Sequence, residues 1–142
     1  KRQGRYLAAL KSSLGLVYKN DFAKAKTKAR ALAQEFPESI ASDLITCEIF
    51  VRRRDYKGAL RSCEAVLGKH NKNAWAPYLL GLVLHRQGKT EKAVARLIQA
   101  IDNDASLKAA YEALGKIYKR SGDERLSPLQ AAYKARFKAE LK

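Results

Sequence analysis

The sequence predicts an all-α fold of about eight helices, in which antiparallel helix pairs stack into a solenoid. Apolar residues recur three and four positions apart, and no segment alternates polar and apolar side chains as a strand would. The same pattern returns every 34 residues. A fixed period of this length is typical of stacked helical hairpins, because each pair buries its apolar face against the next pair.

Four sets of equivalent residues carry the period. Two sets are small, which lets helix backbones approach where they cross. A third is large and apolar and suits the space between hairpins, and the fourth marks the turn within each hairpin. In this order, the sets are Ser13, Cys47, Gly81 and Gly115; Ala25, Ala59, Ala93 and Ser127; Leu16, Phe50, Leu84 and Tyr118; and Asn20, Arg54, Gly88 and Gly122.

The helices follow from the apolar spacing and from their start and stop signals. Aspartates after the turns are expected to be N-caps at positions 21, 55 and 123, with Lys89 as the exception. Asn73 can cap the fifth helix, which leaves Pro77 in its first turn. The expected helices span about 5–18, 21–35, 39–53, 56–69, 74–87, 90–102, 106–121 and 127–141.

The last helix departs from the period. In strict register Pro128 would lie inside a helix and clash with the carbonyl four residues earlier, at a cost of about 3 kcal/mol. We therefore expect Ser127 to be the N-cap and Pro128 the first helical residue. The offset helix would cover the last hairpin with one face, formed by Leu129, Ala132, Tyr133, Phe137 and Leu141.

These offsets resemble those of the tetratricopeptide repeat, a 34-residue helix–turn–helix. The best match is 74–107, where Leu80-Gly81, Leu84, Gly88, Ala93, Leu97 and Ala100 are in register. The resemblance covers nearly the whole chain, with repeats at about 6–39, 40–73, 74–107 and 108–141. It implies one domain over 1–142, a right-handed superhelical solenoid, and a concave groove lined by the first helix of each pair.

The resemblance also implies where a ligand would bind. Trp75 and Tyr78 are three residues apart and share a helix face, and aromatic residues beside arginine are typical of binding hot spots. The residues that we expect to bind a partner in the concave groove are Arg52, Trp75, Tyr78, Leu82, His85, Arg86, Lys116 and Arg120. The wider set of expected groove positions also includes Leu7, Leu10, Lys11, Leu14, Val17, Leu44, Ile45, Glu48, Val51, Leu79, Glu112 and Lys119.

An apolar groove with basic flanks favours a protein partner. The expected ligand is an amphipathic helix or an extended peptide that carries acidic residues. Some members of the family bind the C-terminal carboxylate of heat-shock chaperones through a clamp of Lys and Asn, and the corresponding positions here include Leu10, Leu14, Ile45, Trp75 and Leu79. The chain is thus expected to be a non-catalytic scaffold or adaptor that does not use this clamp.

Charge supports an alternative function. The chain carries 29 Lys and Arg against 14 Asp and Glu, a net charge of +15, which raises the alternative that it binds RNA or another polyanion. The charge is greatest in the terminal repeats and smallest in 74–107. Lys24, Lys26, Lys28 and Arg30 wrap around a helix that the resemblance places on the outer face, where a solvated surface is the simpler explanation for them. A homo-oligomerisation unit is a third alternative, because an empty apolar groove can self-associate.

The candidates for chemistry are few. Cys47 and Cys63 occupy packing positions, and we expect two reduced, buried side chains; a disulfide stays open and would need Cα atoms within about 7 Å. Neither cysteine has further ligands at metal-binding spacing. His70 is expected in a solvated turn, and His85 has no carboxylate three or four residues away that would orient it as a general base. No catalytic, cofactor or metal site is therefore predicted.

Two features of the sequence bear on the location of the protein. No apolar run approaches the roughly 20 residues that a membrane-spanning helix needs, and no segment resembles a signal peptide. This favours the cytoplasm, although a signal removed upstream would leave no trace. The chain contains no Met and begins with Lys-Arg-Gln-Gly-Arg, so we expect it to be a segment of a longer protein.

Overall fold

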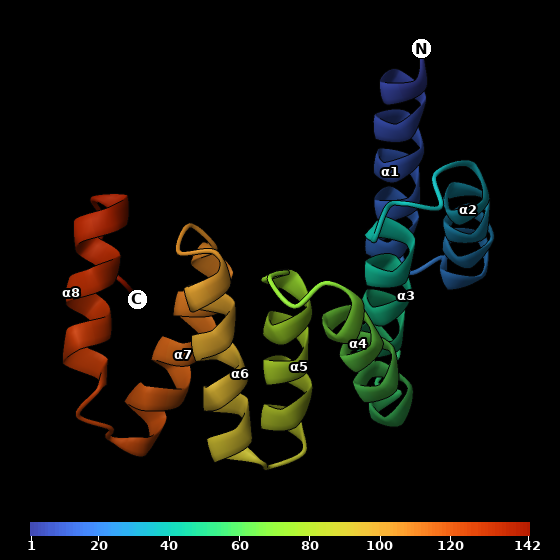
Figure 1. Cartoon of the computed structure of the whole chain (residues 1–142). Helices are drawn as coiled ribbons and strands as arrows, with labels where there is room; N and C mark the ends of the chain where they lie inside the picture. The colour runs from blue at the N-terminus through green and yellow to red at the C-terminus, as the bar shows by residue number, and fades with distance from the viewer. The chain divides into compact units, whose positions relative to one another are not determined.

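In the computed structural model, which describes all residues from Lys1 to Lys142, the chain forms eight α-helices. They are α1 (Arg2–Tyr18), α2 (Phe22–Glu35), α3 (Ala41–Arg52), α4 (Tyr56–Lys69), α5 (Trp75–Arg86), α6 (Thr90–Asn103), α7 (Lys108–Ser121) and α8 (Leu126–Phe137). The all-α prediction is confirmed, and the expected helix ends agree within three residues everywhere except at the end of α8. The chain divides into two compact units, Lys1–Asn71 and Lys72–Lys142 (Figure 1).

The first unit contains α1 to α4. Helix α2 packs against both α1 and α3, α1 also contacts α3, and α4 packs against α3 (Figure 1). One cluster of apolar side chains joins α1, α2 and α3, as the small and large positions of the repeat predict. Its buried members are Val17, Ala25, Ala29, Leu32, Phe36, Ala41, Ile45 and Ile49.

The second unit contains α5 to α8, and α5 packs closely against α6. Gly81 and Ala93 are buried there together with Leu97. A Cβ atom on Gly81 would lie 2.7 Å from Leu97 Cγ and 3.3 Å from the Ala93 carbonyl oxygen. Only a residue without a side chain lets α5 and α6 approach this closely.

The four turn residues of the 34-residue period share one backbone conformation. Asn20, Arg54, Gly88 and Gly122 have φ values of 63°, 61°, 79° and 65°. This left-handed conformation is free of steric cost only for glycine. The first unit therefore pays a backbone cost at Asn20 and Arg54 that the second unit avoids with its two glycines.

Helix caps confirm two of the three expected aspartates. The Asp21 carboxylate accepts a hydrogen bond from the Lys24 amide at 3.4 Å, and that of Asp55 accepts one from the Gly58 amide at 3.1 Å. Asn73 Oδ1 accepts from the Ala76 amide at 2.8 Å, so Pro77 does lie in a capped first turn. The expectation for Asp123 was wrong, because the N-cap of α8 is Arg125.

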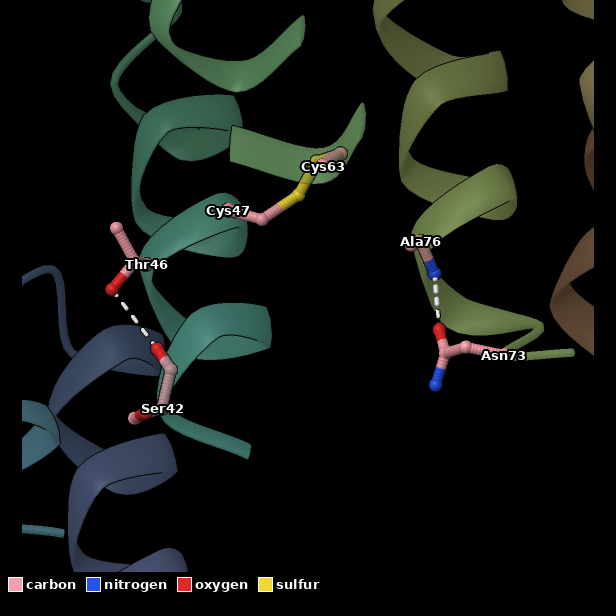
Figure 2. Close-up of a disulfide and its surroundings, with 6 residues drawn as sticks. All are labelled: Ser42, Thr46, Cys47, Cys63, Asn73 and Ala76. Atoms are coloured by element: carbon pink, nitrogen blue, oxygen red, sulfur yellow. Dashed lines mark hydrogen bonds between the residues drawn. A yellow bond between two sulfur atoms is a disulfide. The ribbon is translucent and has the colours of Figure 1, made fainter. Parts of the chain in front are cut away.

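The two cysteines form a disulfide, so the expectation of two reduced side chains was wrong. Cys47 on α3 and Cys63 on α4 are both fully buried, and their Cα atoms are 5.4 Å apart (Figure 2). Close packing of α3 and α4 provides this approach, because Cys47 stands at a small position of the repeat. The bond joins the two helices of the second hairpin covalently.

Helix α8 begins and ends differently from the prediction. It starts at Leu126, so Ser127 is a helical residue and Pro128 is the third residue of the helix, where its missing amide still costs no hydrogen bond. The helix ends at Phe137, and Lys138 turns the chain with a φ of 57°. The segment beyond it brings Leu141 back into a cluster with Tyr111 and Tyr133, against which Leu129 and Phe137 pack. Ala132, expected on the same face, is exposed.

The turn between α7 and α8 is held by Arg125. Its guanidinium donates two hydrogen bonds to the Asp123 carboxylate, at 3.0 and 2.8 Å, and its backbone amide donates a third at 2.8 Å. The same guanidinium lies 4.8 Å from the centre of the Tyr118 ring. These bonds to Arg125 lower the pKa of Asp123 from its usual 3.8 to about 2.

This pKa predicts a pH-dependent contribution to stability. A carboxyl group whose pKa is lower in the folded state stabilises it above the unfolded-state pKa and loses that effect as the pH falls through the folded-state pKa. The stabilising effect of Asp123 should thus be complete above about pH 4 and vanish near pH 2. We expect the difference in melting temperature between the wild type and Asp123→Asn to shrink as the pH is lowered over this window. A constant difference would contradict the assignment.

Candidate functional site

Most of the sequence-predicted residues of the second unit, with the exception of Trp75, come together between α5 and α7. Tyr78, Leu82, His85 and Arg86 are spaced by three and four residues and therefore share one face of α5. Lys116 lies on the facing side of α7, which packs directly against α5. We call this region the α5–α7 groove.

The groove contains a cavity of about 330 Å³, which we call the apolar cavity. Its walls are formed by the α5 side chains named above and by α7, and Leu97 of α6 contributes to its floor. Two small residues of α7, Ala109 and Ala113, leave room for this volume, which larger side chains would fill. The full lining is Tyr78, Gly81, Leu82, His85, Arg86, Leu97, Ala109, Glu112, Ala113, Lys116 and Ile117.

A second cavity of about 420 Å³ adjoins the first, and we call it the basic cavity. It is lined by His85, Lys116, Lys119 and Arg120, so the two cavities share His85 and Lys116. Lys119 and Arg120 belong to the last turn of α7 and are exposed. The two cavities together expose four cationic side chains and one carboxylate, that of Glu112, so the groove is suited to an anionic ligand.

His85 is only partly exposed, and its two ring nitrogens have different environments. Nδ1 is shielded from solvent and has no hydrogen-bond partner. A buried N–H without an acceptor costs about 1–3 kcal/mol, so we assign the proton of the neutral ring to Nε2. The Nε2 atom of His85 therefore offers a hydrogen-bond donor to whatever occupies the groove.

Trp75 and Arg52 lie outside both cavities. The Trp75 ring is 4.9 Å from the Tyr78 ring, centre to centre, which confirms that the two share a face of α5, but Trp75 does not line either cavity. Arg52 belongs to the first unit. Its Nε lies 3.4 Å from Glu48 Oε2, and its guanidinium lies 4.9 Å from the centre of the Tyr18 ring. Partners within the first unit thus occupy Arg52.

Several positions of the wider groove set are buried in the core. Leu79 is 1% exposed, although its neighbour Tyr78 lines the apolar cavity. One residue along a helix rotates the side chain by about 100°, which is enough to move it from the groove into the hairpin. The same correction applies to Val17, Ile45 and Val51. Conversely, Leu97, which lines the apolar cavity from α6, was not among the positions considered for the groove, and Ala109 and Ala113 were considered only as positions of the chaperone clamp. The two alanines, four residues apart on one face of α7, were the available signal.

The remaining chemistry is limited. His70 is exposed, as expected, at the end of α4. No three His, Cys, Asp or Glu side chains are grouped so that they could hold a metal ion. None of the eight helices has both the length and the apolar character that crossing a membrane requires.

Comparison with known proteins identifies relatives of this architecture. A family model described as "Tetratricopeptide repeat" matches residues 50–123. Tetratricopeptide repeat protein 37 of Xenopus laevis is 32% identical over 72 residues, a match that covers 49% of this chain and 4% of that protein. The chain therefore spans only a small part of this relative.

Solved structures share the fold at low sequence identity. MamA (residues 41 to the end) from Desulfovibrio magneticus RS-1 superimposes with a TM-score of 0.66 and 22% identity, over 92% of this chain and 72% of that one. The pilF structure from Pseudomonas aeruginosa gives a TM-score of 0.74 and 20% identity, over 94% and 60% of the respective chains. These likenesses support the helical-repeat fold that the 34-residue period predicts.

Proposed function

We propose, because this chain belongs to the tetratricopeptide repeat family, that it is a non-catalytic scaffold whose α5–α7 groove binds a segment of another protein. A general protein-binding role is what relatives with this fold have in common. The observation that carries the specific proposal is the adjacency of the two cavities, one with an apolar floor and one lined by cations. A peptide or amphipathic helix with an apolar residue followed by acidic groups matches both.

Each cavity has a distinct part in this proposal. The apolar side chain of the ligand would pack on Leu82 beside the Tyr78 ring, which offers a large contact area at a low cost in conformational entropy. Arg86 and Lys116 at the rim would meet the acidic residues, which favours association and orientation more than it adds affinity. Trp75 supports the site by packing against Tyr78. Arg52, in the first unit, is not needed for this groove.

The test is a double substitution in the groove. Tyr78→Ala with Arg86→Glu removes the aromatic wall and reverses one rim charge, and we expect it to weaken binding by at least 2 kcal/mol, or about thirtyfold in Kd. Wild type and variant would be used to capture proteins from a lysate, first at about 0.1 M and then at about 0.5 M salt, because salt screens exposed charges. The captured protein would then be purified and its affinity for both forms measured directly.

Two controls make the result interpretable. Lys92→Glu reverses a charge at an exposed position of α6 that lines neither cavity, so it should leave binding unchanged. Circular dichroism and thermal melting should be similar for all three proteins. Binding that survives the double substitution at full strength removes the groove assignment.

The same experiment separates the alternative functions. Nucleic acid, or a mixture of acidic proteins, that is released at high salt and retained by the double variant would indicate a polyanion-binding module. The logarithm of the binding constant for a polyanion falls linearly with log[salt]. Self-association is tested by light scattering at high concentration, where a monomer argues against a homo-oligomerisation unit.

A further inference from the structure

The basic cavity is a donor-only site. His85, Lys116, Lys119 and Arg120 all present nitrogen donors, and no carboxylate lines this cavity. The carboxylate of Glu112 lines the neighbouring apolar cavity instead. A ligand here must therefore be rich in acceptor oxygens.

The cations of this cavity are not neutralised within the chain. Lys116, Lys119 and Arg120 are exposed, they lie three and four residues apart on one face of α7, and none of them forms an ion pair. Like charges at this spacing repel one another. The C-terminal end of α7 supplies only a fraction of a negative charge. Three full positive charges thus remain for a ligand to compensate.

His85 adds a partly buried donor to these exposed side chains. Its ring lines both cavities, and because Nδ1 is buried and unpartnered, Nε2 is the ring nitrogen that can donate to a ligand. A flexible lysine or arginine alone loses side-chain entropy on binding. A partly buried imidazole at the centre of the set reduces that loss and fixes where an oxygen atom would sit.

We propose that the basic cavity binds a phosphate monoester carried by the protein segment whose apolar side chain occupies the apolar cavity. This inference rests on the proposed function of the groove and names the modification that its ligand carries. A phosphate monoester bears close to two negative charges at neutral pH and three acceptor oxygens. A carboxylate offers a single charge, and would leave most of the cationic excess uncompensated. Because the cavities share two lining residues, the apolar residue and the phosphorylated residue would be close neighbours in the bound segment.

The first experiment uses inorganic phosphate as the probe and the whole chain labelled with ¹⁵N. Phosphate is titrated at neutral pH, with acetate at matched ionic strength as a second arm. We expect saturable shifts of the His85 ring and of the Lys119 and Arg120 amides with phosphate, and at least tenfold weaker binding of acetate. Equal responses to both anions would overturn the phosphate assignment.

A matched pair of variants tests the location. Lys119→Glu with Arg120→Glu should weaken phosphate binding at least tenfold. Lys89→Glu with Lys92→Glu makes the same change in charge on exposed residues outside both cavities and should leave the titration unchanged. If the two variants behave alike, phosphate binds through net charge only and the proposed site is wrong.

Two further arms distinguish the remaining outcomes. Tyr78→Ala should leave the phosphate titration intact while it weakens partner binding, so failure of the groove proposal and failure of the phosphate proposal can be told apart. A short single-stranded RNA forms the second arm. If RNA saturates the same residues and inorganic phosphate does not, the cavity serves a nucleic acid and the inference is overturned.

Discussion

Substitution of Gly81 by alanine is expected to lower the free energy of unfolding of the second unit by about 2 kcal/mol, which is typical of overpacking. The new methyl carbon would lie 2.7 and 2.8 Å from Leu97 Cγ and Cδ2. Leu97 is fully buried and cannot swing aside. The helix-propensity gain of about 1 kcal/mol from replacing glycine is too small to offset the clash. For a unit of this size we expect the melting temperature to fall by about 10 °C.

Gly15→Ala is the matched control. Gly15 also lies inside a helix, α1, but a Cβ atom there would meet nothing within 4 Å. Only the gain in helix propensity should then act, so the free energy of unfolding should be unchanged or higher by up to about 1 kcal/mol. The double variant Gly81→Ala with Leu97→Ala should lose less stability than the sum of its single substitutions, since removing the leucine relieves the clash. Gly81→Ala and Gly15→Ala variants of equal stability would refute the close-crossing argument.

Loss of the Cys47–Cys63 disulfide is expected to destabilise the first unit by about 3 kcal/mol, the value typical for a loop of about this length. The two cysteines are 16 residues apart. In the unfolded chain, the bond permits only conformations in which Cys47 and Cys63 stay close together. Cys47→Ala with Cys63→Ala, which keeps both positions small and apolar, should show this loss. Hydrogen exchange resolved along the chain would detect it as reduced protection of α3 and α4.

The amides of α6, in the second unit, serve as the reference in that hydrogen-exchange measurement.

A reducing agent should reproduce the effect of the double alanine variant slowly, because both cysteines are buried and become accessible only when the hairpin of α3 and α4 opens. Alkylation of the unfolded, unreduced protein provides the direct check. Two free thiols there would contradict the disulfide.

The period of the sequence predicts elements and turns well because both depend on local patterns. The four left-handed turn residues fall at the positions that the 34-residue period marks, and two of them are not glycines. Asp21 and Asp55 cap their helices as their places after the turns indicate. These turns and caps depend only on residues that are close to one another in the sequence.

Features that depend on contacts between distant residues were less predictable. The spacing of 16 between the cysteines does not reveal that α3 and α4 bring them within bonding distance. Asp123 is drawn away from its expected capping role by the Arg125 guanidinium. In the groove, Tyr78 and Leu82 line the apolar cavity, but the expected boundary between groove and core was misplaced at Leu79, because one residue along a helix changes the direction of the side chain by about 100°.

The return of the chain at Lys138 has a practical consequence for handling the protein. Leu141 Cδ2 would lie 3.1 Å from a Cβ atom on Gly115, and Leu141 is itself only 7% exposed. An affinity tag or a dye attached directly after Lys142 therefore starts from an anchored point beside α7, so a dye there should tumble with the second unit and have high fluorescence anisotropy. Shortening the chain to Phe137 would uncover the aromatic cluster of Tyr111 and Tyr133.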